Sequence, residues 1–302
     1  MLYQPIRIAA RASRLAQAQA RAVAQALAVP AELVAISTRA DRTARPLAEV
    51  GGKGLFTAEL EEALRAGRVH LAVHSAKDVP AVMADGTVIA AVPPRADPRD
   101  ALVCAGAGDL DALPRGARVG TSSPRRACQL LADRPDLLIV PVRGNVDTRL
   151  GKLRAGHVDA LVLAMAGLER LGLLGELAGM IRPLPVELFV PAAGQGALVV
   201  QCLAVAAEAR ALASAANDAE SISAVMAERM VVRRLGAGCR SAVGVHVRRE
   251  GPAWRAVGMV GRADGREVVR CSALGPCARA AAERLLEALA DAGAGEIVVS
   301  ER

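Results

Sequence analysis

The alternation of short apolar runs with helical patterns limits the fold of this chain more than any other feature of its sequence. Residues 6–9 form a β-prone run, a helical pattern over 15–28 follows behind Ser13 as N-cap, and residues 33–38 form a second β-prone run. The same order recurs downstream, with a helix expected at 57–66 and strands at 71–74 and 88–92. This order is typical of an α/β lobe with a mostly parallel sheet.

The proline-rich stretch at 93–100 interrupts this pattern and indicates a linker to a second lobe. Beyond it we expect strands at 102–104, 119–121, 137–142 and 160–164, with helices near 125–132, 146–155 and 166–171. Residues 183–191 break the pattern again, and the strand expected at 198–203 could return to the first sheet. Two periplasmic-binding-protein-like lobes joined by two crossings of the chain would form a cleft, the usual ligand site of open α/β sheets.

From about residue 219 the pattern changes to a small α+β domain. A long helix at 222–234 precedes short strands at 243–247, 256–260 and 268–271 and a helix at 276–290. The predicted division is lobe 1 at 1–95 and 196–215, with a mobile loop at about 42–56, lobe 2 at 98–193, and a C-terminal domain at 217–302. A chain of 302 residues is long enough for each part to bury its own core.

Composition argues against several classes of protein. The hydrophobic fraction of 53% is spread over short runs, none near the roughly 18 apolar residues that a membrane span needs. Residues 1–20 lack the apolar core and cleavage site of a secretory signal, so the expected location is cytoplasmic. The cysteines show no C-x-x-C pair, which argues against a metal site.

The net charge of +7 raises the question of a nucleic-acid partner. The basic residues, however, are scattered along the chain rather than run together. The aromatic side chains are also too few to stack on bases, being only Tyr3, Phe56, Phe189 and Trp254. We therefore expect neither a nucleic-acid nor a membrane partner.

Two arginine-rich turns indicate the kind of ligand. Residues 120–126 (GTSSPRR) and 142–149 (VRGNVDTR) each join an expected strand end to a helix start. Free N–H groups at a helix start favour anions, and guanidinium forks fit carboxylate or phosphate oxygens. The sequence thus predicts a small polyanionic ligand, either carbon-framed or phosphorylated.

Four further segments are each weak when taken alone: the Arg11/Ser13 turn, residues 51–56 (GGKGLF), residues 73–80 (VHSAKDVP) and residues 235–239 (LGAGC). The glycine-lysine turn at 51–54 lacks the spacing of a phosphate loop. Lys77 and Asp78 at a strand end could be a surface pair, and Cys239 could be an ordinary buried cysteine.

Taken together and in order, these segments resemble the porphobilinogen deaminase (hydroxymethylbilane synthase) family over nearly the whole chain. The matching stretches are the Arg11/Ser13 turn, GGKGLF at 51–56, AVHSAKDVP at 72–80, DPRDALV at 97–103, GTSSPRR at 120–126, RGNVDTR at 143–149, AGLERLGL at 166–173, PAAGQGA at 191–197 and GAGC at 236–239. The resemblance implies a monomeric transferase of porphyrin and heme biosynthesis. Its small-molecule substrate would be porphobilinogen, four of which it would join head to tail with loss of ammonia.

The resemblance also implies a dipyrromethane primer, bound covalently to Cys239 as a thioether. Glycines leave the approach to this thiol open, and Arg233, Arg234 and Arg240 should favour its thiolate. The other cofactor-binding residues that it implies are Asp41, Ser75, Lys77, Asp78, Thr121, Ser123, Arg125 and Arg126. The substrate-binding residues that it implies are Arg11, Ser13, Gln19, Lys53, Phe56, Arg143, Asn145, Arg149, Arg170 and Gln195.

Asp78 is the expected catalytic residue. Loss of ammonia from porphobilinogen leaves an azafulvenium cation, and a carboxylate beside the pyrrole nitrogens would stabilise that charge and assist proton transfer. Lys77 would keep Asp78 ionised through its opposite charge. Lys53 and Phe56 fall in the part that resembles the family's lid, where they would contact carboxylates and a pyrrole ring. Phe56 could instead be a packing residue at a helix entry.

The sequence departs from the family pattern in the first turn and in the lid. Ala10 and Arg14 stand where the family usually has Thr and Pro, Glu49 stands where it often has Lys, and the loop after Asp41 is one residue shorter. The rival hypothesis is a two-lobed protein that binds a small polyanion without chemistry, since fold alone does not fix function. A reactive thiol at Cys239 would argue against that rival.

Overall fold

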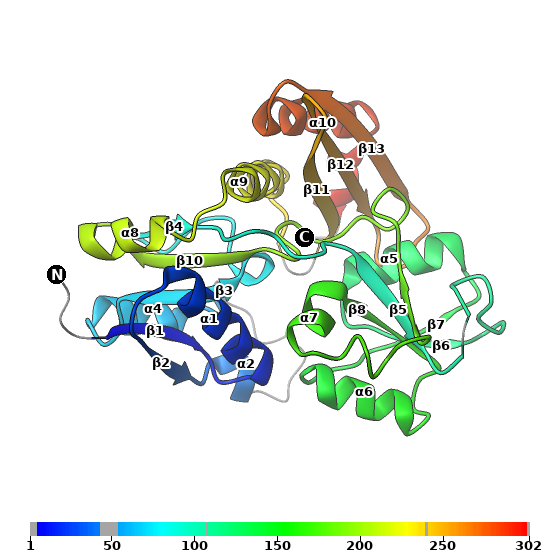
Figure 1. Ribbon diagram of the computed structural model, residues 1–302. Coiled ribbons are helices and arrows are strands. Elements are labelled where there is room, and N and C mark those ends of the chain that lie inside the picture. The colour runs from blue at the N-terminus through cyan, green and yellow to red at the C-terminus, as the bar shows by residue number, and fades with distance from the viewer. Residues whose placement is uncertain (1–4, 43–53, 107, 239–240, 301–302) are drawn as a thin grey trace. The chain divides into compact units, whose positions relative to one another are not determined.

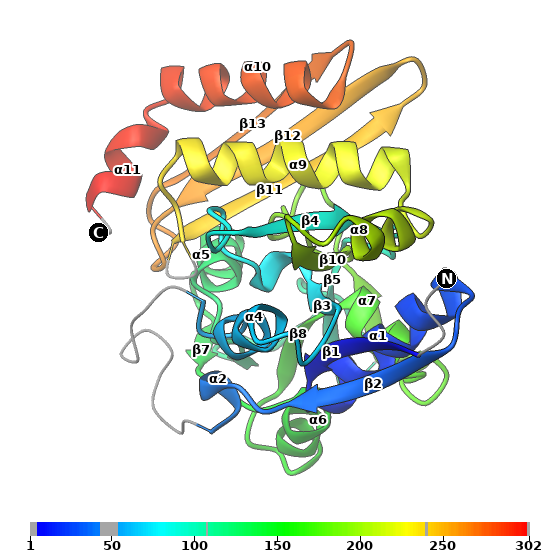
Figure 2. The same cartoon turned by 90° about the vertical axis from the view of Figure 1, so that its left-hand side faces the viewer.

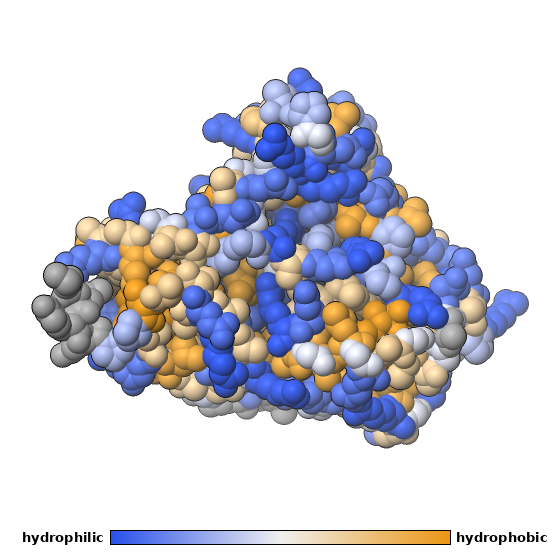
Figure 3. Space-filling view, in the orientation of Figure 1, coloured by the Kyte–Doolittle hydropathy of each residue, from blue (hydrophilic) through white to orange (hydrophobic). Residues whose placement is uncertain are grey.

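The computed structural model describes residues 5–42, 54–106, 108–238 and 241–300, and the chain divides into two compact units (Figure 1). The first unit consists of Met1–Ala96 and Ala197–Val225, and the second of Asp97–Gly196 and Met226–Arg302. On the face drawn in Figure 3, hydrophilic residues are spread over both units. No helix in the described ranges is long and apolar enough to cross a membrane.

A five-stranded sheet with the strand order β2-β1-β3-β10-β4 forms the centre of the first unit. Its strands are β1 (Ile6–Arg11), β2 (Ala31–Ile36), β3 (Leu71–Ser75), β4 (Thr87–Ala91) and β10 (Leu198–Leu203). Its helices are α1 (Arg14–Leu27), α2 (Arg39–Arg42), α4 (Ala58–Arg65), the 3-10 turn η1 (Ala76–Asp78), α8 (Ala207–Ser214) and the first part of α9 (Ala219–Arg234). The predicted return of the strand at 198–203 to this sheet is confirmed, because β10 pairs antiparallel with β3 and β4.

Side-chain alternation along the strands places an apolar core on each face of this sheet. On one face, Ile8 packs in a cluster with Val23 of α1. On the other, Ala9 packs with Leu60 of α4. The predicted N-cap of α1 is confirmed, since Ser13 Oγ accepts a hydrogen bond of 3.3 Å from the backbone N–H three residues on. The cap and the apolar face together fix α1 against the ends of β1 and β3.

The second unit repeats the same sheet arrangement in the order β7-β6-β8-β5-β9. Its strands are β5 (Asp100–Cys104), β6 (Arg118–Gly120), β7 (Leu138–Val140), β8 (Ala160–Ala164) and β9 (Ile181–Pro183), and its helices are α5 (Pro124–Asp133), α6 (Val146–Arg154) and α7 (Met165–Arg170). In each sheet one strand, β10 or β5, runs against all the others, and that strand follows directly after the chain changes unit. The prediction of two α/β lobes with mostly parallel sheets is confirmed.

The C-terminal residues add an antiparallel sheet to the second unit. It consists of β11 (Ala242–Glu250), β12 (Ala253–Gly261) and β13 (Val268–Gly275), followed by α10 (Ala278–Asp291) and α11 (Ala294–Ser300) (Figure 2). Gly258 lets α10 lie close to one face, because a Cβ there would come within 3.0 Å of the Leu285 side chain. On the other face Met259 packs with Cys128 of α5. The α+β character is confirmed, whereas the separation into three domains stays a prediction because both sheets share one compact unit.

Candidate functional site

A pocket in the first unit lies where β1 and β3 end. β1 ends at Arg11 and β3 at Ser75, and because the two strands are parallel, both ends lie at the same edge of the sheet. The pocket is lined by six of the residues that the sequence singled out, namely Arg11, Ser13, Gln19, Phe56, Ser75 and Asp78. The structure thus brings these residues together, while their roles stay predictions.

Arg11 supplies a positive charge to this pocket. Its guanidinium carbon lies 4.8 Å from the ring centre of Phe56, within cation–π distance. Arg11 also forms an ion pair with Asp41 of α2, whose carboxylate accepts hydrogen bonds from the Thr38 N–H (3.0 Å) and hydroxyl (2.8 Å). Burial raises the pKa of Asp41, but the bonds from Arg11 and Thr38 outweigh it and hold the pKa below its ordinary value. Asp41, which the sequence assigned to the cofactor site, is therefore paired with Arg11 of the pocket in this structure.

Residues of α1 and of the turn after β3 form another wall of the pocket, and a hydrogen bond joins the two elements. The Gln19 amide donates to Ser75 Oγ at 3.0 Å. The first N–H of η1 then donates to the Ala197 carbonyl at 3.0 Å, which anchors the turn. Lys77 and Asp78 both lie in η1 at half-buried positions. Asp78 lines the pocket, whereas Lys77 is not among the lining residues.

A buried polar network runs through the sheet next to this pocket. His74 is only 4% exposed, and its Nε2 lies 2.9 Å from Gln201 Oε1. The Gln201 amide donates to Thr87 Oγ1 at 2.8 Å and to Glu61 Oε1 at 3.3 Å, so its Oε1 accepts and His74 Nε2 carries the proton. Burial lowers the pKa of His74 to about 4; the bond to Gln201 opposes this shift and the charge of Arg11 adds to it. His74 is therefore a neutral imidazole at physiological pH. The sequence motifs give His74 no role, although a histidine in an otherwise apolar strand is a signal that could have pointed to it.

His74→Gln should reduce the loss of stability that accompanies acidification from pH 7 to pH 4. The unfolded chain protonates His74 near its ordinary pKa of 6.5, whereas the folded chain resists protonation down to about 4. Because the unfolded state binds the extra proton in this interval, the wild type loses roughly 3 kcal/mol of folding free energy through this group as the pH falls. Urea unfolding at several pH values measures the difference. Equal pH dependence in both proteins would contradict the prediction, and His157→Gln, at an exposed position, controls for loss of one histidine.

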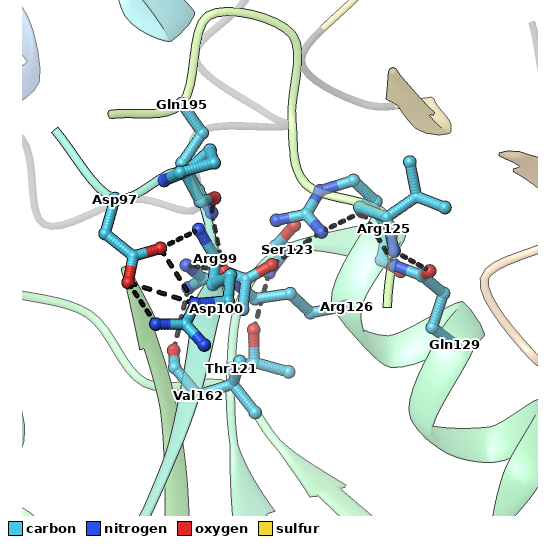
Figure 4. Close-up of polar contacts among 12 residues, drawn as sticks. Asp97, Arg99, Asp100, Thr121, Ser123, Arg125, Arg126, Gln129, Val162 and Gln195 are labelled. Atoms are coloured by element: carbon cyan, nitrogen blue, oxygen red, sulfur yellow. Dashed lines mark hydrogen bonds and ion pairs between the residues drawn. The ribbon is translucent and has the colours of Figure 1, made fainter. Parts of the chain in front are cut away.

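In the second unit, the two arginines of the GTSSPRR turn bind the buried carboxylate of Asp100 (Figure 4). The Ser123 N–H donates to Thr121 Oγ1 at 3.2 Å, and α5 starts with Arg125 and Arg126 in its first turn. These arginines are 4% and 7% exposed, and Asp100, the first residue of β5, is 0% exposed. Asp100 Oδ2 accepts from Arg125 Nη1 at 2.8 Å, and its Oδ1 accepts from Arg126 Nη2 at 2.6 Å and Nε at 2.9 Å. Two buried positive charges thus share one negative charge.

Backbone carbonyls accept a further hydrogen bond from each guanidinium group. Arg126 Nη1 donates to the Val162 carbonyl at 2.7 Å, and Arg125 Nη1 donates to the Val190 carbonyl at 2.6 Å. Within the described part of the chain, Nε and Nη2 of Arg125 have no hydrogen-bond partner. Burial lowers the pKa of Arg125, with Asp100 raising it and Arg126 lowering it further. The guanidinium nevertheless stays charged at any physiological pH.

The second arginine turn leads into α6. Asn145 caps this helix by accepting a hydrogen bond of 2.8 Å from the Thr148 N–H. Gly144 has a φ of 108°, and a Cβ there would come within 2.7 Å of Thr148. Arg149 Nε donates to the Gly144 carbonyl at 3.0 Å, and both Arg143 and Arg149 are half-buried. The turn therefore keeps its two arginines partly accessible.

Two residues predicted to bind substrate form hydrogen bonds within the protein, and their substrate role stays a prediction. Gln195 is 1% exposed, and its Nε2 donates to the Pro98 carbonyl at 2.8 Å and to Asp100 Oδ1 at 3.0 Å. Arg170 Nη2 donates to the Gly196 carbonyl at 2.7 Å. Burial lowers the pKa of Arg170, against the charge of its neighbour Glu169. Both side chains thus hold the segment that precedes β10.

Lys53, Cys239 and Arg240 lie outside the described residues, as does most of the expected lid. Where the chain is described, no group of three or more His, Cys, Asp and Glu side chains is placed to hold a metal ion. Asp100 was not among the predicted site residues, although its position in the DPRDALV stretch at 97–103 is a signal that could have pointed to it.

Comparison with known proteins identifies relatives along the whole chain. A family model described as porphobilinogen deaminase, dipyrromethane cofactor binding domain, matches residues 6–211. The porphobilinogen deaminase of Roseiflexus sp. (strain RS-1) is 51% identical over 271 residues, covering 88% of each chain. That of Syntrophotalea carbinolica is 44% identical over 303 residues, covering 98% of this chain and 95% of the relative. Among solved structures, a TctC solute binding protein from Polaromonas has a TM-score of 0.41 at 14% identity over 71% of this chain and 83% of its own, a likeness too slight to define the fold.

Proposed function

The chain belongs to the porphobilinogen deaminase family, and on this premise we propose that it joins four porphobilinogen molecules head to tail into hydroxymethylbilane, with loss of ammonia at each addition. It is a transferase of tetrapyrrole biosynthesis, and residues 6–211 match the family's dipyrromethane cofactor-binding domain. The observation that carries the proposal is the buried Asp100–Arg125–Arg126 cluster, which lies within the matched domain.

The chemistry of this cluster fits a dipyrromethane. Each ring of that group carries an acetate and a propionate, so the site must supply positive charge and paired N–H donors. Arg125 and Arg126 exceed the charge of Asp100 by one, and the unbonded Nε–Nη2 edge of Arg125 matches the two oxygens of a carboxylate. Thr121 and Ser123 at the start of α5 add polar groups beside the arginines. When bound, the group supplies the primer on which the pyrrole chain is built.

We assign the covalent attachment of this group to Cys239, as a thioether. Support comes from the GAGC sequence at 236–239, in which only small residues precede the cysteine, and from the basic Arg233 and Arg234 at the end of α9. Opposite charge nearby favours a thiolate, which is the nucleophilic form of cysteine. The roles of Asp41, Ser75 and Lys77 toward the same group stay proposals.

The pocket of the first unit is the proposed site for the incoming porphobilinogen. A substrate carboxylate would bind the Arg11 guanidinium in competition with Asp41, while the ring contacts Phe56. Asp78 would accept a hydrogen bond from the pyrrole N–H and stabilise the positive charge that develops as ammonia leaves. Further contacts to carboxylates of substrate or chain are proposed for Ser13, Gln19, Lys53, Arg143, Asn145, Arg149, Arg170 and Gln195.

Intact mass tests the proposed function. Full-length protein exposed to porphobilinogen should carry an added mass equal to two linked pyrrole units and should release hydroxymethylbilane. Cys239→Ser should lack this mass, whereas Cys277→Ser, at an exposed free cysteine, should retain it. A wild-type chain that binds porphobilinogen but never gains the adduct or releases product would favour the binding-protein hypothesis.

We also propose that the protein acts as a cytoplasmic monomer without a nucleic-acid partner. The five described cysteines are all free, as expected in a reducing compartment, and the basic residues are scattered along the sequence. Size-exclusion chromatography with light scattering tests the oligomeric state. Retention of DNA on a filter at moderate salt would contradict the last point.

A further inference from the structure

We propose that Asp100 is the positioning residue of the dipyrromethane site: it holds one side of both guanidinium groups and thereby keeps the Nε–Nη2 edge of Arg125 open for a carboxylate. This inference rests on the proposed function, because it names a residue that acts on the cofactor through its ligands. Asp100 itself is 0% exposed, so its side chain is sealed from the surface and acts only through its neighbours.

The carboxylate of Asp100 is fixed from several directions. It is the first residue of β5, where it pairs with Ala164 of β8, and its carbonyl accepts from the Leu184 N–H at 2.8 Å. Its Oδ1 accepts from Gln195 at 3.0 Å in addition to Arg126. A carboxylate held by the strand and by a neutral donor has a defined orientation before any ligand binds, which is the requirement for preorganisation.

The two arginines are held to different degrees. Arg126 bonds through all three of its nitrogens, two to Asp100 and one to the Val162 carbonyl. Arg125 uses only Nη1, which donates to Asp100 and to the Val190 carbonyl. Without Asp100, Arg125 would keep one hydrogen bond, to the Val190 carbonyl, and a ring contact with Phe189 at 6.0 Å, and its long side chain could rotate the Nε–Nη2 edge away. A guanidinium binds carboxylate well only when its fork is aimed at the two oxygens.

Positioning and simple charge balance predict opposite outcomes when Asp100 is neutralised. If Asp100 only reduced the positive charge of the site, its removal would add one unit of positive charge and strengthen attraction for a polycarboxylate. If Asp100 positions the arginines, its removal misaims them and weakens binding in spite of the extra charge. The sign of the change therefore separates the two roles.

Asp97 provides a matched control for the experiment. It lies three residues before Asp100, and its carboxylate also binds an arginine, Arg99, with Nη2 at 2.6 Å and Nε at 3.0 Å. Unlike Asp100, it is partly exposed, and no hydrogen bond in the structure connects it to Arg125 or Arg126. Asp97→Asn removes the same charge from the same segment without changing any hydrogen bond of the Asp100–Arg125–Arg126 cluster.

The test follows the formation of the covalent adduct over time. Full-length wild type, Asp100→Asn, Asp100→Glu and Asp97→Asn are produced in cells that make no porphobilinogen, checked for folding by circular dichroism, and incubated with porphobilinogen. Intact mass then gives the rate of adduct formation. We expect Asp100→Asn to form the adduct about tenfold more slowly or worse, Asp100→Glu to recover part of the rate, and Asp97→Asn to stay within about twofold of wild type.

Each outcome decides the matter. An Asp100→Asn rate equal to or above that of wild type would overturn the inference and leave the proposed function intact. If Asp100→Asn does not fold, Asp100→Glu decides, because it keeps the charge and displaces the carboxylate: a slower rate supports positioning and an unchanged rate overturns it. If the wild type itself gains no adduct, the proposed function fails and this inference fails with it.

Discussion

Replacing Asp78 by Asn should lower kcat by about 10³-fold while the protein stays folded and keeps its covalent primer. Asp78 lies half-buried in η1, at the end of β3, and lines the pocket that also holds Arg11. Asn has nearly the same volume as Asp but no charge. The substitution therefore removes the carboxylate that stabilises the positive charge on the pyrrole as ammonia departs. Because the lost interaction exists mainly in the transition state, kcat should fall and KM should change little.

Steady-state release of hydroxymethylbilane, with intact mass on the same samples, measures this effect. Asp85→Asn is the control, since Asp85 is exposed and does not line the pocket. Near-normal turnover of Asp78→Asn would remove Asp78 from the catalytic role. A loss of turnover that came with loss of the primer would mean instead that Asp78 acts in cofactor attachment.

Local signals explain why much of the fold could be predicted from sequence. The first helix is set by a cap at Ser13 and an apolar face that includes Val23, and both can be seen within one stretch of chain. The mostly parallel sheets follow from the alternation of strands and helices, because parallel strands need a crossover between them. β9 (Ile181–Pro183) was not predicted, since a three-residue strand beside prolines carries too little periodicity to be recognised.

The parts of the site that were missed depend on contacts between residues far apart in sequence. The hydrogen bond between His74 and Gln201 joins residues 127 positions apart in the sequence, and the one between Arg126 and Asp100 joins residues 26 positions apart. The motifs named Arg126 as a ligand but gave no sign that a buried carboxylate holds it. Register between strands and the start of α5 bring these groups together, and neither can be read from the pattern of one segment.

Arg126→Met should destabilise the protein by roughly 3–5 kcal/mol, more than any surface arginine. The substitution keeps the apolar stem of the side chain but removes two bonds to Asp100 and one to the Val162 carbonyl. Asp100 would then stay at 0% exposure, with Arg125 and Gln195 still among its side-chain donors. A buried charge that loses a partner cannot regain water, so the cost of desolvation is no longer offset.

Arg118→Met is the matched control, because Arg118 lies at the start of β6 in the same sheet and pairs with Asp159 at 2.8 Å, but with about two-fifths of each side chain exposed. Water can replace that partner, so its loss should cost far less stability than the loss of Arg126. Urea unfolding of the two variants against wild type measures both effects. Equal, small losses would mean that the Asp100 cluster is open to solvent in solution, and would contradict both its burial and the positioning role that depends on it.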